Sequence, residues 1–162
     1  MIHAYDNQYL DDAMRCLGEA MDYAANGCQM NMDSFLELFI GSGYAEQFAA
    51  GVPKYVSGVS GTELVMDVLT KSGTDMDFPQ ATIDYDYSPQ YWCGWILAYY
   101  QWHSGKSFAA KREIGNQSEA FDLVCRNADS RDAKSSENER SDQNTGNQIR
   151  SNCGELYYFS KS

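Results

Sequence analysis

The sequence has few of the residues on which common metal and catalytic sites depend. Only two histidines, His3 and His103, occur in 162 residues, and the five cysteines include no Cys-x-x-Cys pair. This scarcity argues against a zinc site, and an odd number of cysteines argues against a complete disulfide framework. We therefore expect reduced thiols in a cytoplasmic protein that uses no metal and no cofactor.

Long hydrophobic runs are also missing. The longest apolar run, residues 91–100, is about half of the ~20 residues that a membrane-spanning helix needs, and Gly94 interrupts it. Residues 1–6 show no basic segment followed by an apolar stretch, so no secretory signal is expected. We expect no association with a membrane.

Positive charge is scarce as well. The chain has 12 Lys and Arg against 23 Asp and Glu, which gives a formal net charge of −11. Such a charge opposes binding to the phosphate backbone of nucleic acid or to anionic lipid. The partners that we expect are therefore proteins, basic ones in particular, or further copies of this chain, with no direct nucleic-acid contact.

The charge divides the chain into two regions. Residues 1–108 hold 14 acids and four bases, whereas residues 109–162 hold nine acids and eight bases and contain no Trp, Met or Pro. Residues 109–124 could form one more helix, but residues 126–152 are too polar to offset their ordering entropy by burial. The sequence thus predicts an acidic domain over 1–108 and a disordered polar tail over 109–162.

Apolar periodicity within the first region predicts a mainly α fold, a single small domain of about five helices. Capping residues mark the ends of these helices: Asp6, Asn31 or Asp33, Ser60 with Glu63, and Ser88 before a proline. The expected helices cover residues 6–26, 32–40, 44–49, 61–72 and 89–104.

Glycines and loops fill the rest of the predicted domain. Asn26-Gly27 is expected to act as a left-handed helix stop and Gly105 to end the last helix, and Gly18 could let another helix approach closely. Residues 54–59 are predicted to be extended or loop, and residues 74–87 to be a loop with a short extended piece at 81–85.

An acidic loop, residues 75–86, is the alternative candidate for a functional site. Asp75, Asp77, Asp84 and Asp86 could gather around a hard cation or serve a small enzyme or ligand-binding protein. The pattern lacks the glycine and the final glutamate of an EF-hand loop, so a solvated loop is the preferred interpretation.

The sequence supports the other candidate catalytic arrangements even less than the acidic loop. Cys93 and His103 are ten residues apart on one predicted helix, which separates them by about 15 Å along its axis. The glycines around residues 58–61 are not followed by the Lys of a phosphate-binding loop, and they suit a helix start. We predict no catalytic residues.

The last predicted helix is unusually aromatic. Its rings cover more than one helix face, so one neighbouring helix cannot bury them all, although most should form the centre of the core. Of the candidates, Tyr100 and Trp102 are the ones that we most expect to face a partner. The candidate partner-binding residues are Trp92, Trp95, Tyr99, Tyr100 and Trp102.

Several segments, covering about residues 1–108, together resemble the N-terminal domain of bacterial transcriptional regulators that carry an XRE-type helix-turn-helix at their C-terminus. These are Met-Ile-His-Ala-Tyr (1–5), Phe-Leu-Glu-Leu-Phe-Ile-Gly-Ser-Gly (35–43), Ala-Glu-Gln-Phe (45–48), a Val-Ser-Gly helix opening (57–64) and Tyr-Trp-Cys-Gly-Trp-Ile-Leu-Ala-Tyr-Tyr-Gln-Trp (91–102). The resemblance implies DNA binding only through the downstream module.

This chain departs from that pattern after Phe108, where no second helical pair follows. One hypothesis for the abrupt change is a tail translated from a shifted reading frame or a truncated gene. We accordingly predict a non-catalytic interaction or sensory domain, antitoxin-like in binding a basic partner. The alternative is a small ligand- or metal-binding protein or enzyme that uses the acidic loop.

Overall fold

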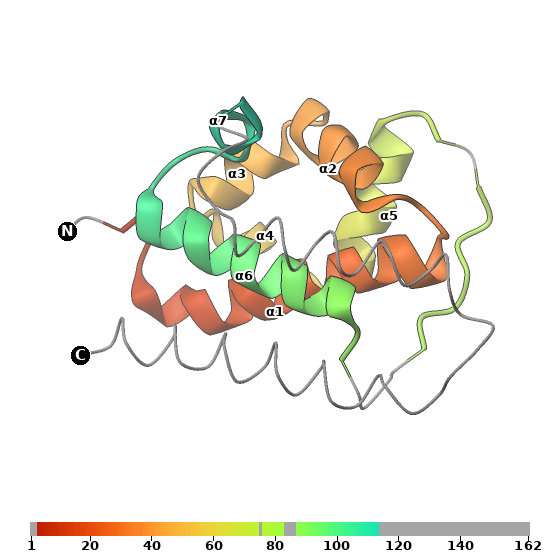
Figure 1. Ribbon diagram of the computed structural model, residues 1–162, viewed down its shortest axis with the longest axis horizontal. Helices are drawn as coiled ribbons and strands as arrows, with labels where there is room; N and C mark the ends of the chain where they lie inside the picture. The colour runs from red at the N-terminus through yellow and green to blue at the C-terminus, as the bar shows by residue number, and fades with distance from the viewer. Residues whose placement is uncertain (1–2, 75, 83–86, 114–162) are drawn as a thin grey trace.

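A computed structural model describes residues 3–74, 76–82 and 87–113, with only the backbone for 111–113. Over these residues every regular element is a helix, as the mainly α prediction requires. The elements are a 3-10 turn (Asn7–Tyr9), α1 (Leu10–Asp22), a π-helical turn (Tyr23–Gly27), α2 (Met32–Gly41), α3 (Tyr44–Ala49), α4 (Pro53–Val56), α5 (Gly61–Lys71), α6 (Pro89–Ser104) and α7 (Phe108–Glu113) (Figure 1).

The central feature of the fold is the pairing of α1 with α6, which lie side by side and run in opposite directions (Figure 1). Two glycines allow the close approach. A Cβ atom on Gly18 would lie 2.8 Å from the ring of Tyr91, and one on Gly94 would collide with the backbone carbonyl of Leu17. The expectation for Gly18 is therefore confirmed, and Gly94 plays the same part on the opposite helix.

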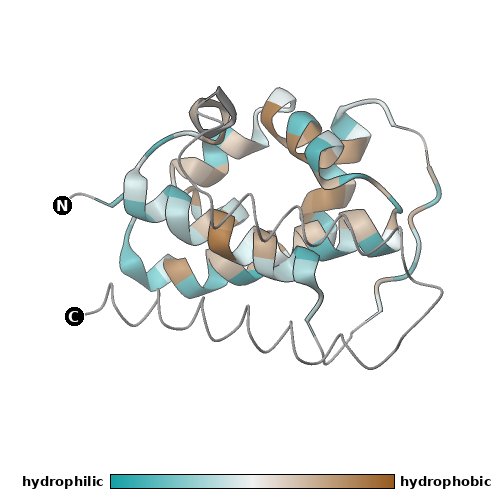
Figure 2. Cartoon of the chain, viewed as in Figure 1, coloured by the Kyte–Doolittle hydropathy of each residue, from teal (hydrophilic) through white to brown (hydrophobic). Residues whose placement is uncertain are grey.

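The core fills the space between this pair and the helices on the other side of the molecule, where α2, α3 and α7 lie (Figure 1). Phe35, Phe39 and Phe48 are fully buried, and the ring of Phe108 packs edge-on at 5.4 Å from Phe39. The helices carry hydrophobic residues on some sides and hydrophilic ones on others, as expected where one stripe of each helix is buried (Figure 2).

Most predicted helix ends are confirmed. Asp6 accepts a hydrogen bond from the backbone N–H of Gln8, and Ser60 and Glu63 form the reciprocal capping box at the start of α5. Ser88 caps α6 by accepting from the N–H of Tyr91. The stop at Gly105 is left-handed, with φ of 64°.

Two local predictions are wrong. Residues 54–59 are not all extended or loop, because Pro53 begins the short helix α4, and the fixed φ of proline suits the first helical position. Asn26-Gly27 is not a left-handed stop; the chain closes a wider turn with the N–H of Cys28 donating to the carbonyl of Tyr23, and Gln29 takes the positive φ instead. Within the described residues, the short helices α4 and α7 add to the five that were expected.

The predictions for the C-terminal region fall largely beyond the described residues. Helix α7 begins at Phe108, where the composition changes, and the buried ring of Phe108 ties that point to the core. Residues 109–113 of the predicted disordered tail are helical and belong to α7, in line with the alternative of one more helix over 109–124. The rest of the tail, residues 114–162, lies outside the described residues, as do residues 83–86 of the proposed extended piece. In the part of the chain that the structure describes, no helix is long and apolar enough to cross a membrane.

Candidate functional site

The outward side of α6 carries an aromatic surface. Trp92, Trp95 and Tyr99 follow one another at helical spacings of three and four residues and are each half-buried, and Tyr100 beside them is 38 % exposed. The opposite side of the helix, which includes Gly94, faces α1 and is buried. One helix thus provides both a core surface and an outward surface.

The rings at the start of this surface touch one another. Tyr87, which precedes the N-cap of α6, stacks on Tyr91 with ring centroids 4.1 Å apart and meets the edge of Trp92 at 5.7 Å. Trp92 in turn meets Trp95 edge-on at 5.8 Å. We call Tyr87, Trp92, Trp95, Tyr99 and Tyr100 the aromatic face.

Sequence reasoning missed Tyr87, because it was placed in a loop. A signal was available, since Tyr87 is four residues before Tyr91 and such a spacing allows two rings to meet across a helix turn. With 51 % of its surface exposed, Tyr87 is the most exposed large hydrophobic residue of the described chain.

Trp102 does not belong to the aromatic face, and the expectation that its side chain faces outward is wrong, whereas its role in partner binding stays a prediction. Only 6 % of its surface is exposed. Its indole Nε1 donates a 2.8 Å hydrogen bond to the carbonyl of Tyr5, and the ring of His3 stacks on it at 3.7 Å. The N-terminal residues cover this side chain, a long-range contact that helical spacing within α6 could not reveal.

The start of α6 is fixed to α1 by polar contacts. Ser88 Oγ donates to the carboxylate of Asp22, and that carboxylate also accepts from Asn26 Nδ2 at 2.8 Å. Burial raises the pKa of Tyr91, and the nearby Tyr87 and Glu19 oppose its ionisation further, so its phenol stays neutral at physiological pH. The aromatic face is therefore anchored on a rigid element and borders acidic residues of α1.

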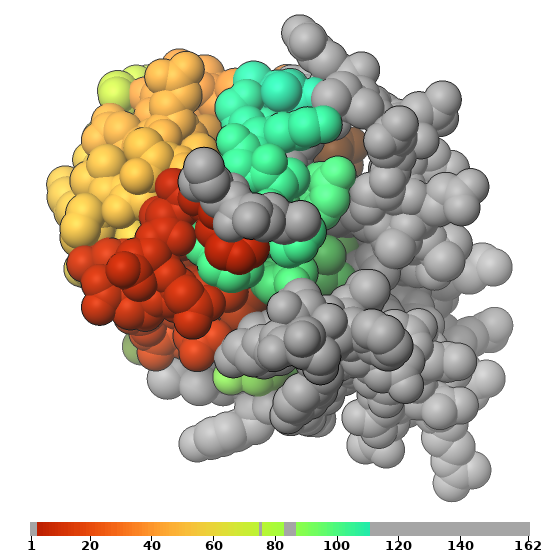
Figure 3. Space-filling model, turned by 90° about the vertical axis from the view of Figure 1, so that its left-hand side faces the viewer, coloured from red at the N-terminus to blue at the C-terminus, as the bar shows by residue number. Residues whose placement is uncertain are grey.

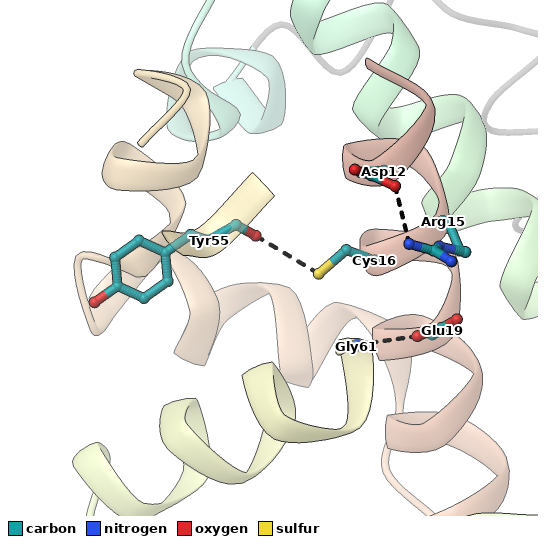
Figure 4. Close-up of polar contacts among 6 residues, drawn as sticks. All are labelled: Asp12, Arg15, Cys16, Glu19, Tyr55 and Gly61. Atoms are coloured by element: carbon teal, nitrogen blue, oxygen red, sulfur yellow. Dashed lines mark hydrogen bonds and ion pairs between the residues drawn. The ribbon is translucent and has the colours of Figure 1, made fainter. Parts of the chain in front are cut away.

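On another side of α1, polar contacts hold α4 and the start of α5 in place (Figure 4). Glu19 accepts from the backbone N–H of Gly61 at 3.2 Å, which places a carboxylate at the N-terminus of α5. The thiol of Cys16 donates to the carbonyl of Tyr55 at 3.6 Å, and burial raises the pKa of this thiol to about 12. A thiol held protonated in this way suits a structural role better than a nucleophilic one.

The described residues assemble no metal-binding cluster from His, Cys, Asp and Glu side chains. Of the acidic-loop candidates, Asp77 is exposed, while Asp75, Asp84 and Asp86 lie outside the described residues. The structure does bring the two histidines together: the ring centroids of His3 and His103 are 5.8 Å apart.

The chain was compared with known proteins. No family model, no curated protein and no solved structure matches it. The XRE-type resemblance stays a prediction, and the aromatic face and the charge of the chain are the features of this molecule that bear on its function.

Proposed function

We propose that this protein is a non-catalytic interaction module whose aromatic face binds a basic segment of a protein partner. The observation that carries the proposal is the continuous run of ring contacts from Tyr87 through Trp92 to Trp95 on the outward side of α6. Trp and Tyr are the residues that most often anchor protein interfaces, because they bury a large area at a small cost in side-chain entropy.

The charge of the chain favours a basic partner. A net charge of −11 attracts cationic surfaces and accelerates their association with this protein. Lysine and arginine side chains also bind well over indole and phenol rings. The chain uses such contacts internally, with Lys71 Nζ 4.7 Å from the ring centroid of Tyr44 and Lys54 Nζ 5.0 Å from that of Tyr55.

The resemblance to regulator N-terminal domains suggests what kind of system the module serves. A sensory or antitoxin-like role would pair this acidic chain with a basic DNA-binding or toxic protein, and any DNA contact would then come from that second protein. A cytoplasmic location fits this role, and the described cysteines, Cys16, Cys28 and Cys93, are free thiols as expected in a reducing compartment.

Site-specific photocrosslinking in cells tests the proposal on the full chain. The photoreactive residue p-benzoylphenylalanine replaces Tyr87 or Tyr100 on the aromatic face, or Thr70 on the exposed side of α5 as the matched control. We expect one basic protein to be captured from Tyr87 and from Tyr100 but not from Thr70, and the capture should fall when a lysate is irradiated at high salt in place of the cells.

A second variant separates recognition from folding. Trp92→Ala should lower the yield of the crosslink about tenfold, as expected for an interface anchor, while the helical circular dichroism spectrum stays that of the unmodified protein. Equal capture from Thr70, capture unaffected by Trp92→Ala, or the absence of any captured protein would each contradict the proposal.

A further inference from the structure

The N-terminal residues are fastened to the last turn of α6 by three contacts that all involve Trp102. The backbone N–H of Ala4 donates to the carbonyl of Trp102 at 3.0 Å, and the indole Nε1 donates to the carbonyl of Tyr5 at 2.8 Å. The ring of His3 stacks on the indole with an interplanar angle of 12°. Figure 3 shows the N-terminal residues, in red, lying against the green and teal residues of α6 and α7.

This arrangement joins the only two histidines of the sequence, which lie 100 positions apart. Their ring centroids are 5.8 Å apart and their planes are inclined by 48°. His3 Nδ1 is buried and has no hydrogen-bond partner among the described residues. Without a proton, this nitrogen can stay in the buried position. With a proton, it becomes an N–H donor that has no group to donate to there.

The surroundings of the pair offer little compensation for two positive charges. From α6, His3 meets Trp102 and His103, and Tyr99 stacks on His103 at 6.0 Å. From its own segment, the phenol of Tyr5 is buried, and burial raises its pKa well above the usual range.

Other described neighbours of this segment place no carboxylate within ion-pair distance of either histidine. Asp6 accepts from the N–H of Gln8, and Gly51, which faces Tyr5 from the connection between α3 and α4, carries no side chain. Among the described residues the one ion pair within 4.0 Å joins Arg15 and Asp12, so neither histidine has a carboxylate partner at that distance.

One protonated histidine is compatible with the closed arrangement, because His103 lies in the last turn of α6 and a cation is favoured at a helix C-terminus. A proton on His3 alone leaves the buried Nδ1–H without an acceptor, but the cation then lies over the Trp102 indole, which offsets this penalty while there is only one charge. Two cations at this separation repel each other, and His3 Nδ1–H would in addition be buried without an acceptor. Detachment of the N-terminal residues relieves both penalties, since it separates the charges and exposes Nδ1 to water.

We propose that residues 3–5 form a pH-sensitive latch over Trp102, closed while at most one of His3 and His103 is protonated and released when both are. Release uncovers the indole of Trp102 next to Tyr99 and so extends the aromatic face towards the C-terminal end of α6. The latch does not depend on the proposed partner binding, because its contacts lie within the chain.

Nuclear magnetic resonance of the full chain between about pH 8 and about pH 5 tests the latch, since this interval spans the ordinary titration range of histidine. The readouts are hydrogen exchange of the Trp102 indole, corrected for its intrinsic pH dependence, and the ring-current shift of the His3 imidazole protons above that indole. We expect protection of the Trp102 indole to fall at least about tenfold at the acidic end, while the amide of Leu17 in α1 stays protected.

Two variants assign the effect to the histidine pair. His3→Phe keeps a flat ring for the stack but cannot be protonated, and His103→Gln removes the second charge. Both should keep the Trp102 indole protected at about pH 5. If His3→Phe already lacks protection at about pH 8, its ring does not reproduce the stack and His103→Gln decides alone.

Three results would overturn the latch. They are unchanged protection of the indole in the unmodified protein down to about pH 5, an equal loss in His103→Gln, or a loss that Leu17 shares, which would indicate global unfolding.

Discussion

The two ends of α6 carry similar aromatic residues with opposite exposures. At the beginning, Tyr87 is 51 % exposed and Trp92 is half-buried, whereas in the last turn Trp102 is only 6 % exposed. The helix itself does not decide this difference, because both ends pack along α1. What differs is that residues 3–5 cover Trp102. Aromatic content therefore indicates where an interface could form, and coverage by a distant segment determines which rings remain outside.

The largest expected effect comes from removing the covered ring. Trp102→Ala eliminates a buried indole, its hydrogen bond to Tyr5 and the stack with His3, and should lower the free energy of unfolding by about 3–5 kcal/mol. Chemical denaturation followed by circular dichroism measures the change. Trp92→Ala, in the half-buried part of the same helix, is the matched comparison and should cost about 1–2 kcal/mol. Equal losses for the two variants would show that coverage by residues 3–5 adds no stability.

The second-largest effect is expected at the contact between α6 and α1, which both ends of α6 share. Gly94→Ala places a methyl group against the carbonyl of Leu17, so the two helices must move apart, and we expect a loss of about 1–3 kcal/mol in denaturant titrations. Gly41→Ala is the control, because a Cβ there meets nothing within 4 Å. In that variant the helix propensity of alanine should leave stability unchanged or raise it by up to about 1 kcal/mol. A neutral Gly94→Ala would contradict the close packing of α1 and α6.

These contrasts explain which parts of the structure were predictable from sequence. Local signals such as the Ser60–Glu63 capping box and the Ser88-Pro89 start specify helix ends within a few residues, so these predictions are confirmed. The start of α4 was missed because residues 54–59 show no helical periodicity of their own, although Pro53 suits a first helical position.

For the candidate site, sequence reasoning identified the aromatic helix but not the exposure of each ring. The outward placement of Trp92 and Trp95 follows from helical spacing. The burial of Trp102 depends on residues almost 100 positions away, and no periodicity within α6 contains that information. Tyr87 was missed for a related reason, since its stack on Tyr91 extends the face beyond the first helical residue.

A smaller effect depends on pH and concerns Cys16 of α1, which acts on Tyr5 in the segment that covers the end of α6. Burial raises the pKa of the Cys16 thiol from its ordinary value of 9.0 to about 12, and Cys16 in turn opposes ionisation of Tyr5 in the covering segment. The folded protein therefore binds more protons than the unfolded chain above about pH 9, and this contribution to stability is lost as the pH rises towards 12.

Urea unfolding at about pH 7 and about pH 10 measures this contribution. From the lower to the higher pH, the free energy of unfolding should fall by about 1 kcal/mol less in Cys16→Ala than in the unmodified protein. Stability is compared between the two pH values within each protein, so the cost of the cavity left by the substitution cancels. An equal decline in both proteins would mean that the Cys16 thiol ionises as readily in the folded state as in the unfolded chain.

The smallest effect is expected at the most exposed ring. Tyr87→Ala removes the 4.1 Å stack on Tyr91 and the edge contact with Trp92, yet half of its surface already faces water. We expect a loss of only about 0.5–1 kcal/mol in the free energy of unfolding, the usual worth of an aromatic pair at the surface. The same variant should reduce capture of the proposed partner far more than this, since an interface anchor acts in the complex and not in the fold. A loss above about 3 kcal/mol would assign Tyr87 to the core and leave α6 without an exposed aromatic end, because that magnitude is typical of fully buried rings.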